Sequence, residues 1–141
     1  ADFYALMPSD NERAIPSGGD ISFPQDGPAS REAIIYRVDD STFGFAQEGI
    51  YQVTYQVSVS EPGQLVLTLN TGKNVEEQLY TVAGREAGGT HIVSNVLIEI
   101  LEKDTKLTVR NPQDNFQDLT LTPQAGGNYP VSAHLVIMKL Q

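Results

Sequence analysis

The stretch from Gly49 to Ser60 reads GIYQVTYQVSVS, and its pattern decides the fold. From Tyr51 onward, tyrosine and valine alternate with glutamine, threonine and serine. A period of two predicts a β-strand with one apolar and one polar face, and β-branched and aromatic residues favour such a pleated surface. Because a long exposed edge invites aggregation, we expect this strand in the interior of a sheet. Gly49 is expected in the turn that leads into it.

Shorter apolar or alternating segments continue on both sides, separated by the turn-forming residues glycine, proline, asparagine and aspartate. Residues 91–101 also fit a helix, but their sparse charges and many branched side chains favour a strand. The chain therefore predicts an all-β fold, an antiparallel sandwich or barrel of many short strands. The other predicted strands cover residues 3–7, 20–24, 33–38, 41–46, 64–70, 78–83, 91–101, 106–110, 119–122 and 131–140.

The composition is that of a folded, acidic protein. The chain has 141 residues, 40% of them hydrophobic and 19% charged, so we expect a single domain spanning residues 1–141. A net charge of −9 argues against binding to nucleic acid and against electrostatic docking on anionic lipid. No apolar run approaches the roughly 20 residues that span a bilayer. The absence of cysteine excludes disulfides and thiolate metal sites.

No catalytic signature stands out in the sequence. It contains no Gly-x-Ser-x-Gly elbow and no glycine-rich phosphate loop, so we expect no enzymatic activity and no cofactor. His91 and His134 lie far apart and have no cysteine companions, so we interpret them as ordinary histidines and expect no metal site within one chain. Loop carboxylates offer oxygen ligands for calcium, but none has EF-hand spacing; we favour solvated charges and leave calcium open.

Several segments occur in an informative order along the chain. These are FYALM at residues 3–7, Phe43-Gly44-Phe45, Gly49-x-Tyr51-x-Val53, LEKDTKL at residues 101–107, and SAHLVI at residues 132–137. Their order resembles the globular heads of the complement first-component q and tumour-necrosis-factor superfamily, most closely the bacterial heads that cap collagen-like proteins on spore and cell surfaces. Two positions depart from the resemblance, because animal members usually carry an aromatic residue where Val53 stands and a glycine where His134 stands.

The resemblance implies a jelly roll of two antiparallel sheets that assembles as a homotrimer. It also implies an extracellular location, on a spore (exosporium) or cell surface, and a non-enzymatic structural role in which a C-terminal head nucleates and caps a collagen-like stalk. The alternative role is a head that binds a ligand, glycan or receptor through exposed loops. No Gly-x-y repeat occurs in this chain, so the stalk rests on the resemblance alone.

The sequence of the last predicted strand indicates a subunit interface even without the resemblance. Residues 135–138 are all apolar, so one face of the strand is expected against the core and the other against a partner copy or a loop of the same chain. The resemblance turns this second face toward a threefold axis, where three copies of His134 would meet and would suit an ion or a proton-sensitive contact. The trimer interface is expected to contain Gln52, Thr54, Gln56, Asn95, Leu97, Ser132, His134, Val136 and Met138.

Overall fold

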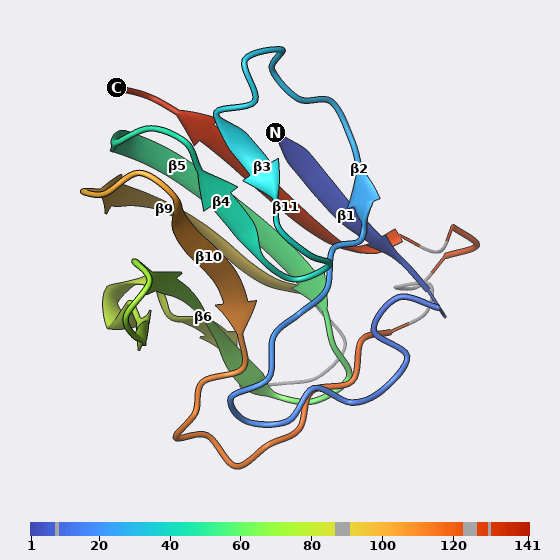
Figure 1. Cartoon of the computed structure of the whole chain (residues 1–141). Coiled ribbons are helices and arrows are strands. Elements are labelled where there is room, and N and C mark those ends of the chain that lie inside the picture. The colour runs from blue at the N-terminus through green and yellow to red at the C-terminus, as the bar shows by residue number, and fades with distance from the viewer. Residues whose placement is uncertain (8, 87–90, 123–126, 130) are drawn as a thin grey trace.

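Two antiparallel sheets pack face to face in the computed structural model, which describes residues 1–7, 9–86, 91–122, 127–129 and 131–141 (Figure 1). The elements are β1 (Asp2–Leu6), β2 (Gln25–Asp26), β3 (Ile35–Arg37), β4 (Phe43–Phe45), β5 (Gly49–Ser58), β6 (Gly63–Asn70), β7 (Val75–Glu77), the 3-10 turn η1 (Leu79–Thr81), β8 (Ala83–Arg85), β9 (His91–Ile100), β10 (Thr105–Arg110) and β11 (Val131–Lys139). One sheet, called the β5 sheet, has the order β2-β1-β11-β5-β9. The other, called the β6 sheet, has the order β3-β4-β10-β6-β7, with β8 also paired to β6. The described residues contain no α-helix, and the predicted all-β sandwich is confirmed.

β5 lies in the interior of its sheet, as its sequence predicts. It pairs with β11 on one side, where Val53 faces Ile137, and with β9 on the other side along its whole length. Alternation turns Tyr51, Val53 and Tyr55 into the core, where each is fully buried. Residues 91–100 form β9 and not a helix, so the strand predicted for residues 91–101 is confirmed up to its last residue.

The hydrophobic core fills the space between the two sheets. Phe43 and Phe45 of β4 are fully buried, and the Phe45 ring meets the Tyr51 ring edge-on with centroids 4.6 Å apart. Ile21 and Phe23 come from the long loop after β1 and are equally buried. Each large apolar side chain that leaves water contributes roughly 1.5–3 kcal/mol, so these loop residues help to hold the two sheets together.

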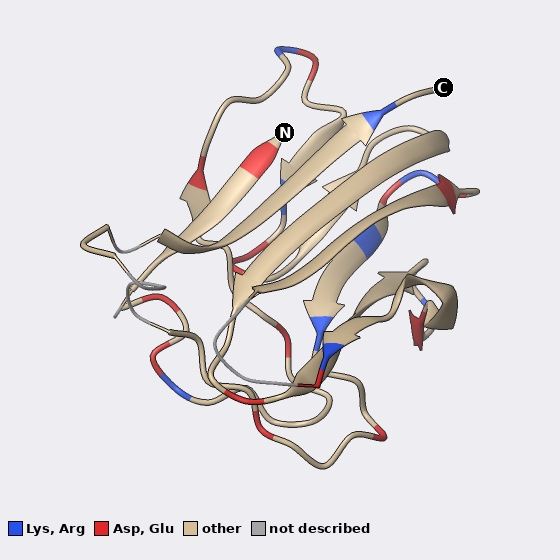
Figure 2. Cartoon of the chain, turned by 180° about the vertical axis from the view of Figure 1, so that it is seen from behind, with Lys and Arg blue, Asp and Glu red and all other residues tan. Residues whose placement is uncertain are grey.

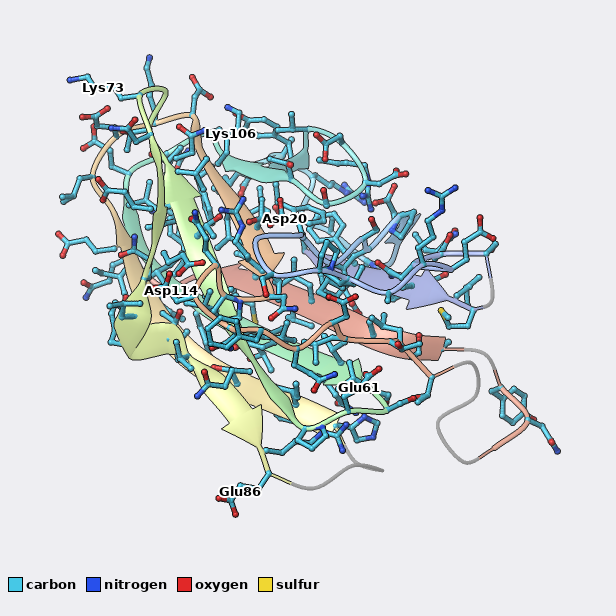
Figure 3. All side chains as sticks on the ribbon, turned by 90° about the horizontal axis from the view of Figure 1, so that it is seen from below. Asp20, Glu61, Lys73, Glu86, Lys106 and Asp114 are labelled. Atoms are coloured by element: carbon cyan, nitrogen blue, oxygen red, sulfur yellow. The ribbon has the colours of Figure 1, made fainter. Side chains whose placement is uncertain are left out.

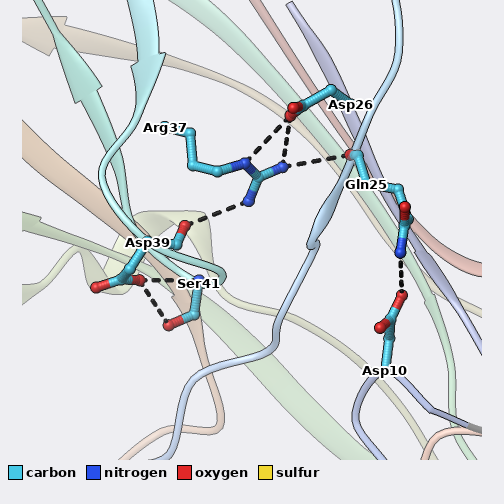
Figure 4. Close-up of polar contacts among 6 residues, drawn as sticks. All are labelled: Asp10, Gln25, Asp26, Arg37, Asp39 and Ser41. Carbon is cyan, nitrogen blue, oxygen red and sulfur yellow. Dashed lines mark hydrogen bonds and ion pairs between the residues drawn. The ribbon is translucent and has the colours of Figure 1, made fainter.

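The strand predicted at residues 20–24 is wrong, because that segment forms only an isolated bridge at Asp20. The strand lies just beyond it, at β2, where Arg37 provides the stabilising contacts (Figure 4). Arg37 Nε and Nη2 donate to Asp26 Oδ1 at 3.1 and 2.7 Å, and Nη2 also donates to the Gln25 carbonyl at 3.3 Å. Pairing with β1 and these contacts from a distant side chain, and not local propensity, therefore hold this short strand.

The strand predicted at residues 78–83 is also wrong, because these residues turn through η1 between β7 and β8. Thr81 Oγ1 donates to the Gln78 carbonyl at 2.7 Å and accepts from the Leu67 amide at 3.0 Å. Hydroxyl groups that bond nearby backbone in this way compete with a strand ladder. Residues 119–122, predicted as a strand, make only isolated bridges.

Both chain ends lie at the same end of the molecule, uppermost in Figures 1 and 2. The ammonium group of Ala1 donates to the Ile137 carbonyl at 2.7 Å, and its partial burial lowers its pKa.

Charged side chains are spread around the loops and strand ends, as the separation of Lys73 from Glu86 in Figure 3 shows. Asp20 pairs with Arg110 at 2.9 Å between Oδ1 and Nε.

Candidate interaction face

The outward side of the β5 sheet, called the β5 face, gathers side chains from four neighbouring strands. The pairing registers set them in rows across the sheet, one row for every second residue. From one end of the sheet to the other, the rows are Met138–Gln52–Leu97, then Asp2–Val136–Thr54–Asn95, then Tyr4–His134–Gln56–Val93. His91 lies opposite Ser58, one row further along.

The residues predicted for the trimer interface all lie on the β5 face, in or beside these rows. Most are exposed or half-buried in the single chain. Ser132 differs, since it is only 3% exposed and has little surface to offer a partner. The structure thus brings the predicted residues together on one surface, and their role in an interface stays a prediction.

Polar side chains in the middle of the β5 face bond one another within the chain. Asn95 Oδ1 accepts from Gln52 Nε2 at 2.8 Å and from Thr54 Oγ1 at 3.1 Å. From the sequence we expect symmetry-related copies to satisfy these groups. Neighbouring strands of the same chain already supply part of that hydrogen bonding, which lowers the cost of covering them.

Large apolar side chains stand exposed on this face, two on β9 and one on β11. Val93 and Leu97 are each 54% exposed, and Met138 is 47% exposed. Tyr80 of η1 lies at the margin and donates its hydroxyl to the Leu97 carbonyl at 2.9 Å. Sequence reasoning missed Val93, although the alternation that selected Asn95 and Leu97 also points to it. It had no signal for Tyr80, because η1 was expected to be a strand.

Few charges lie on the β5 face, although the chain has a net charge of −9. Figure 2 views the molecule from this side and shows coloured segments mainly at strand ends and in loops. Asp2 lies within the rows, and its Oδ1 is 3.1 Å from His134 Nδ1. Glu99, opposite Ile50, adds an exposed carboxylate one row beyond Leu97. The His134 ring also stacks on Tyr4, with ring centroids 5.6 Å apart.

Solved structures are similar to this architecture, whereas no protein-family model and no curated protein matches the sequence. Murine APRIL, crystallised at pH 5.0, aligns over 99% of this chain and 98% of its own, with a TM-score of 0.64 and 14% identity. The globular domain of zebrafish complement 1qA protein aligns over 96% of this chain and 92% of its own, with a TM-score of 0.51 and 14% identity. The chain has the jelly-roll fold of the complement first-component q and tumour-necrosis-factor type. This likeness concerns the fold alone, and it confirms the jelly roll that was expected from the sequence resemblance.

Two hollows lie elsewhere on the described part of the chain. One of ≈ 280 Å³ lies between the β6–β7 and β9–β10 connections and is bordered by Lys73, Glu76 and Glu99. Another, of ≈ 300 Å³, lies along the loop after β1 and is bordered by Asp10 and Asp40. Within the described part of the chain, no three histidine, aspartate or glutamate side chains are grouped to hold a metal.

The described residues also include no helix that is long and apolar enough to cross a membrane.

Proposed function

We propose that this chain is a non-enzymatic interaction module that assembles as a homotrimer through the β5 face. The observation that carries the proposal is the exposure of Val93, Leu97 and Met138 together on one sheet face with few charges. A sheet face that stays in water normally carries polar outward side chains. Apolar side chains clustered on a surface mark an interaction site.

The jelly-roll fold supports a second copy of this chain as the partner. The polar middle of the face suits burial as well, because Asn95 already pairs with Gln52 and Thr54. Val136 is half-buried between Asp2 of β1 and Thr54 of β5, near the centre of the face. A charge placed at this position would be desolvated in an assembled trimer and would face its own copies.

The Val136→Asp variant tests the face against a matched control. We expect it to raise the dissociation constant of the trimer by about 100-fold or more, so that light scattering reports monomers at micromolar concentration. Val75→Asp makes the same change on β7, at the edge of the β6 sheet, where Val75 is 45% exposed. It should remain a trimer like the wild type, and far-ultraviolet circular dichroism should show both variants folded.

The proposal is wrong if Val136→Asp remains a trimer of unchanged stability, or if Val75→Asp dissociates equally. A monomeric wild-type chain would also contradict it. The two variants add the same charge, but Val136 is half-buried opposite Asp2 whereas Val75 is 45% exposed. The circular dichroism of both variants therefore has to separate dissociation from a folding defect.

The proposal also concerns the biological setting of the trimer. In this setting the trimer nucleates and caps a collagen-like stalk on a spore or cell surface. Three associated heads would hold three upstream chains in register, which is what a triple helix needs in order to wind. A stalk of Gly-Pro-Pro repeats fused before Ala1 should therefore melt at a higher temperature with the wild-type head than with the Val136→Asp head. Equal melting temperatures would exclude the nucleating role.

A further inference from the structure

Phe116 lies in the loop that follows β10, where residues 111–118 read NPQDNFQD. Its side chain is 101% exposed, more than any other large hydrophobic side chain of the described residues. Figure 1 shows this loop in orange at the lower end of the molecule, opposite the end that holds both chain termini. Burying a phenylalanine contributes roughly 1.5–3 kcal/mol. The isolated chain does not gain this free energy at Phe116, so the ring is available to a partner.

Asn111 closes the loop on both sides of Phe116. Asn111 is buried, and its Nδ2 donates to the Gln117 carbonyl at 2.8 Å and to the Ile15 carbonyl at 3.0 Å. Leu119 then pairs with Ile15, because the Leu119 amide donates at 3.0 Å and the Leu119 carbonyl accepts at 2.7 Å. The loop therefore leaves and re-enters the folded part of the chain at fixed points.

Asn115, the residue before the exposed ring, fixes the tip of the loop. Its Nδ2 donates to Gln64 Oε1 at 3.2 Å, and its carbonyl accepts a hydrogen bond from the Ser17 hydroxyl. Two residues earlier, the Gln113 amide donates to Glu77 Oε2 at 2.8 Å. These contacts position the ring before any partner is bound, so binding loses little conformational entropy in the loop.

Two carboxylates flank the ring, at Asp114 and Asp118, and both residues are exposed. Residues 111–118 contain no lysine or arginine. Figure 3 looks onto this end of the molecule and labels Asp114, and Figure 2 shows further acidic segments in the neighbouring loops. A protruding apolar ring among negative charges disfavours anionic lipid and nucleic acid. It favours a partner whose contact surface carries basic residues.

We propose that Phe116 anchors a second interaction surface, which binds a partner protein by inserting the ring into an apolar pocket rimmed by lysine or arginine. Aromatic anchors that fill pockets carry most of the binding energy at protein interfaces. Charges at the rim of an interface mainly raise the association rate. A protruding ring gives a small molecule no enclosure, whereas small-molecule sites are concave.

This surface does not depend on the proposed trimer. The loop contacts described above reach the segment after β1 and the strands β6 and β7, and none of them involves the β5 face. A trimer built on the β5 face would display three copies of Phe116, which adds avidity. The monomeric Val136→Asp variant would display one copy and should keep the affinity of a single site. Failure of the trimer and failure of the Phe116 surface are thus separate results.

Selection from a displayed library of random peptides on the wild-type chain tests the proposal, because selected binders gather where protein partners gain most binding energy. We expect most selected peptides to combine lysine or arginine with aliphatic residues, and to bind Phe116→Ser about 10-fold or more weakly in surface plasmon resonance. Leu79→Ser removes another exposed apolar side chain, 73% exposed on η1, and should bind the same peptides unchanged. Replacing Asp114 and Asp118 together by Asn should slow association at low salt.

Thermal unfolding shows whether the variants are folded, since surface substitutions of this kind change stability by roughly 0.5 kcal/mol or less. The proposal is overturned if no peptides are selected, if they bind Phe116→Ser as well as the wild type, or if they depend on Leu79 instead. An unchanged association rate in the double aspartate variant would overturn the basic rim. Binding of the wild type, but not of Phe116→Ser, to neutral phosphatidylcholine vesicles would overturn the choice of a protein partner.

Discussion

At the scale of single residues, Tyr55 shows how a polar atom is accommodated in the core. Its ring is fully buried, and its hydroxyl donates to the Leu65 carbonyl at 3.0 Å, with the Thr81 carbonyl 3.3 Å away. Burial raises the pKa of Tyr55 to about 12, because the phenolate would lose its hydration. The neutral phenol is therefore the form that the fold stabilises.

Replacing Tyr55 by Phe should lower the free energy of unfolding by about 1–2 kcal/mol at neutral pH, since the Leu65 carbonyl loses this donor. The same change should alter the response to alkali. A pKa raised from 10.0 to about 12 gives stability that is fully present below pH 10 and is lost as the pH rises toward 12. Urea unfolding between neutral and alkaline pH should show the wild type losing stability more steeply than Tyr55→Phe. Parallel curves would contradict this account.

At the scale of elements, the pairing of β3 with β4 depends on a glycine. Gly44 lies opposite Tyr36, whose ring covers it, so that a Cβ at position 44 would lie 2.3 Å from the ring carbon Cζ. The Tyr36 hydroxyl reaches beyond the glycine to donate to Asp104 Oδ1 at 2.9 Å. The absence of a side chain at Gly44 is therefore what lets the ring lie flat across the strand pair.

Gly44→Ala should push the Tyr36 ring away and destabilise the fold by about 1–3 kcal/mol. Tyr36→Ala should then cost much less in the Gly44→Ala background than in the wild type, because the ring has already been displaced. Thermal unfolding of the four proteins in this double-mutant cycle measures the coupling. Additive costs would show that the ring and the glycine do not depend on each other.

The long strands were predictable from sequence because their patterns are local. β5 carries a period of two, whereas β9 was inferred from its many branched side chains and β11 from its apolar run. Contacts between distant residues were not predictable. β2 pairs with β1 and is contacted by Arg37 from another strand, and the Thr81 hydroxyl bonds the backbone of a segment whose composition favours a strand.

At the scale of the whole molecule, the account depends on an acidic chain associating with its own copies. With a net charge of −9, each copy repels the others, so association requires apolar contact on a surface with few charges. The β5 face meets this requirement, and the carboxylates of the loops and strand ends lie mostly elsewhere. The proposed function thus depends on assembly as a trimer, and the fold provides the surface for it.

Sedimentation equilibrium of the unmodified chain over a range of micromolar concentrations tests that claim most directly. The method reports the molar mass in solution without a label, a variant or a reference shape. We predict a mass three times that of the 15.4 kDa chain, with dissociation appearing only on strong dilution. A mass of 15.4 kDa at every concentration, or one that settles at twice this value, would contradict a trimer built on the β5 face.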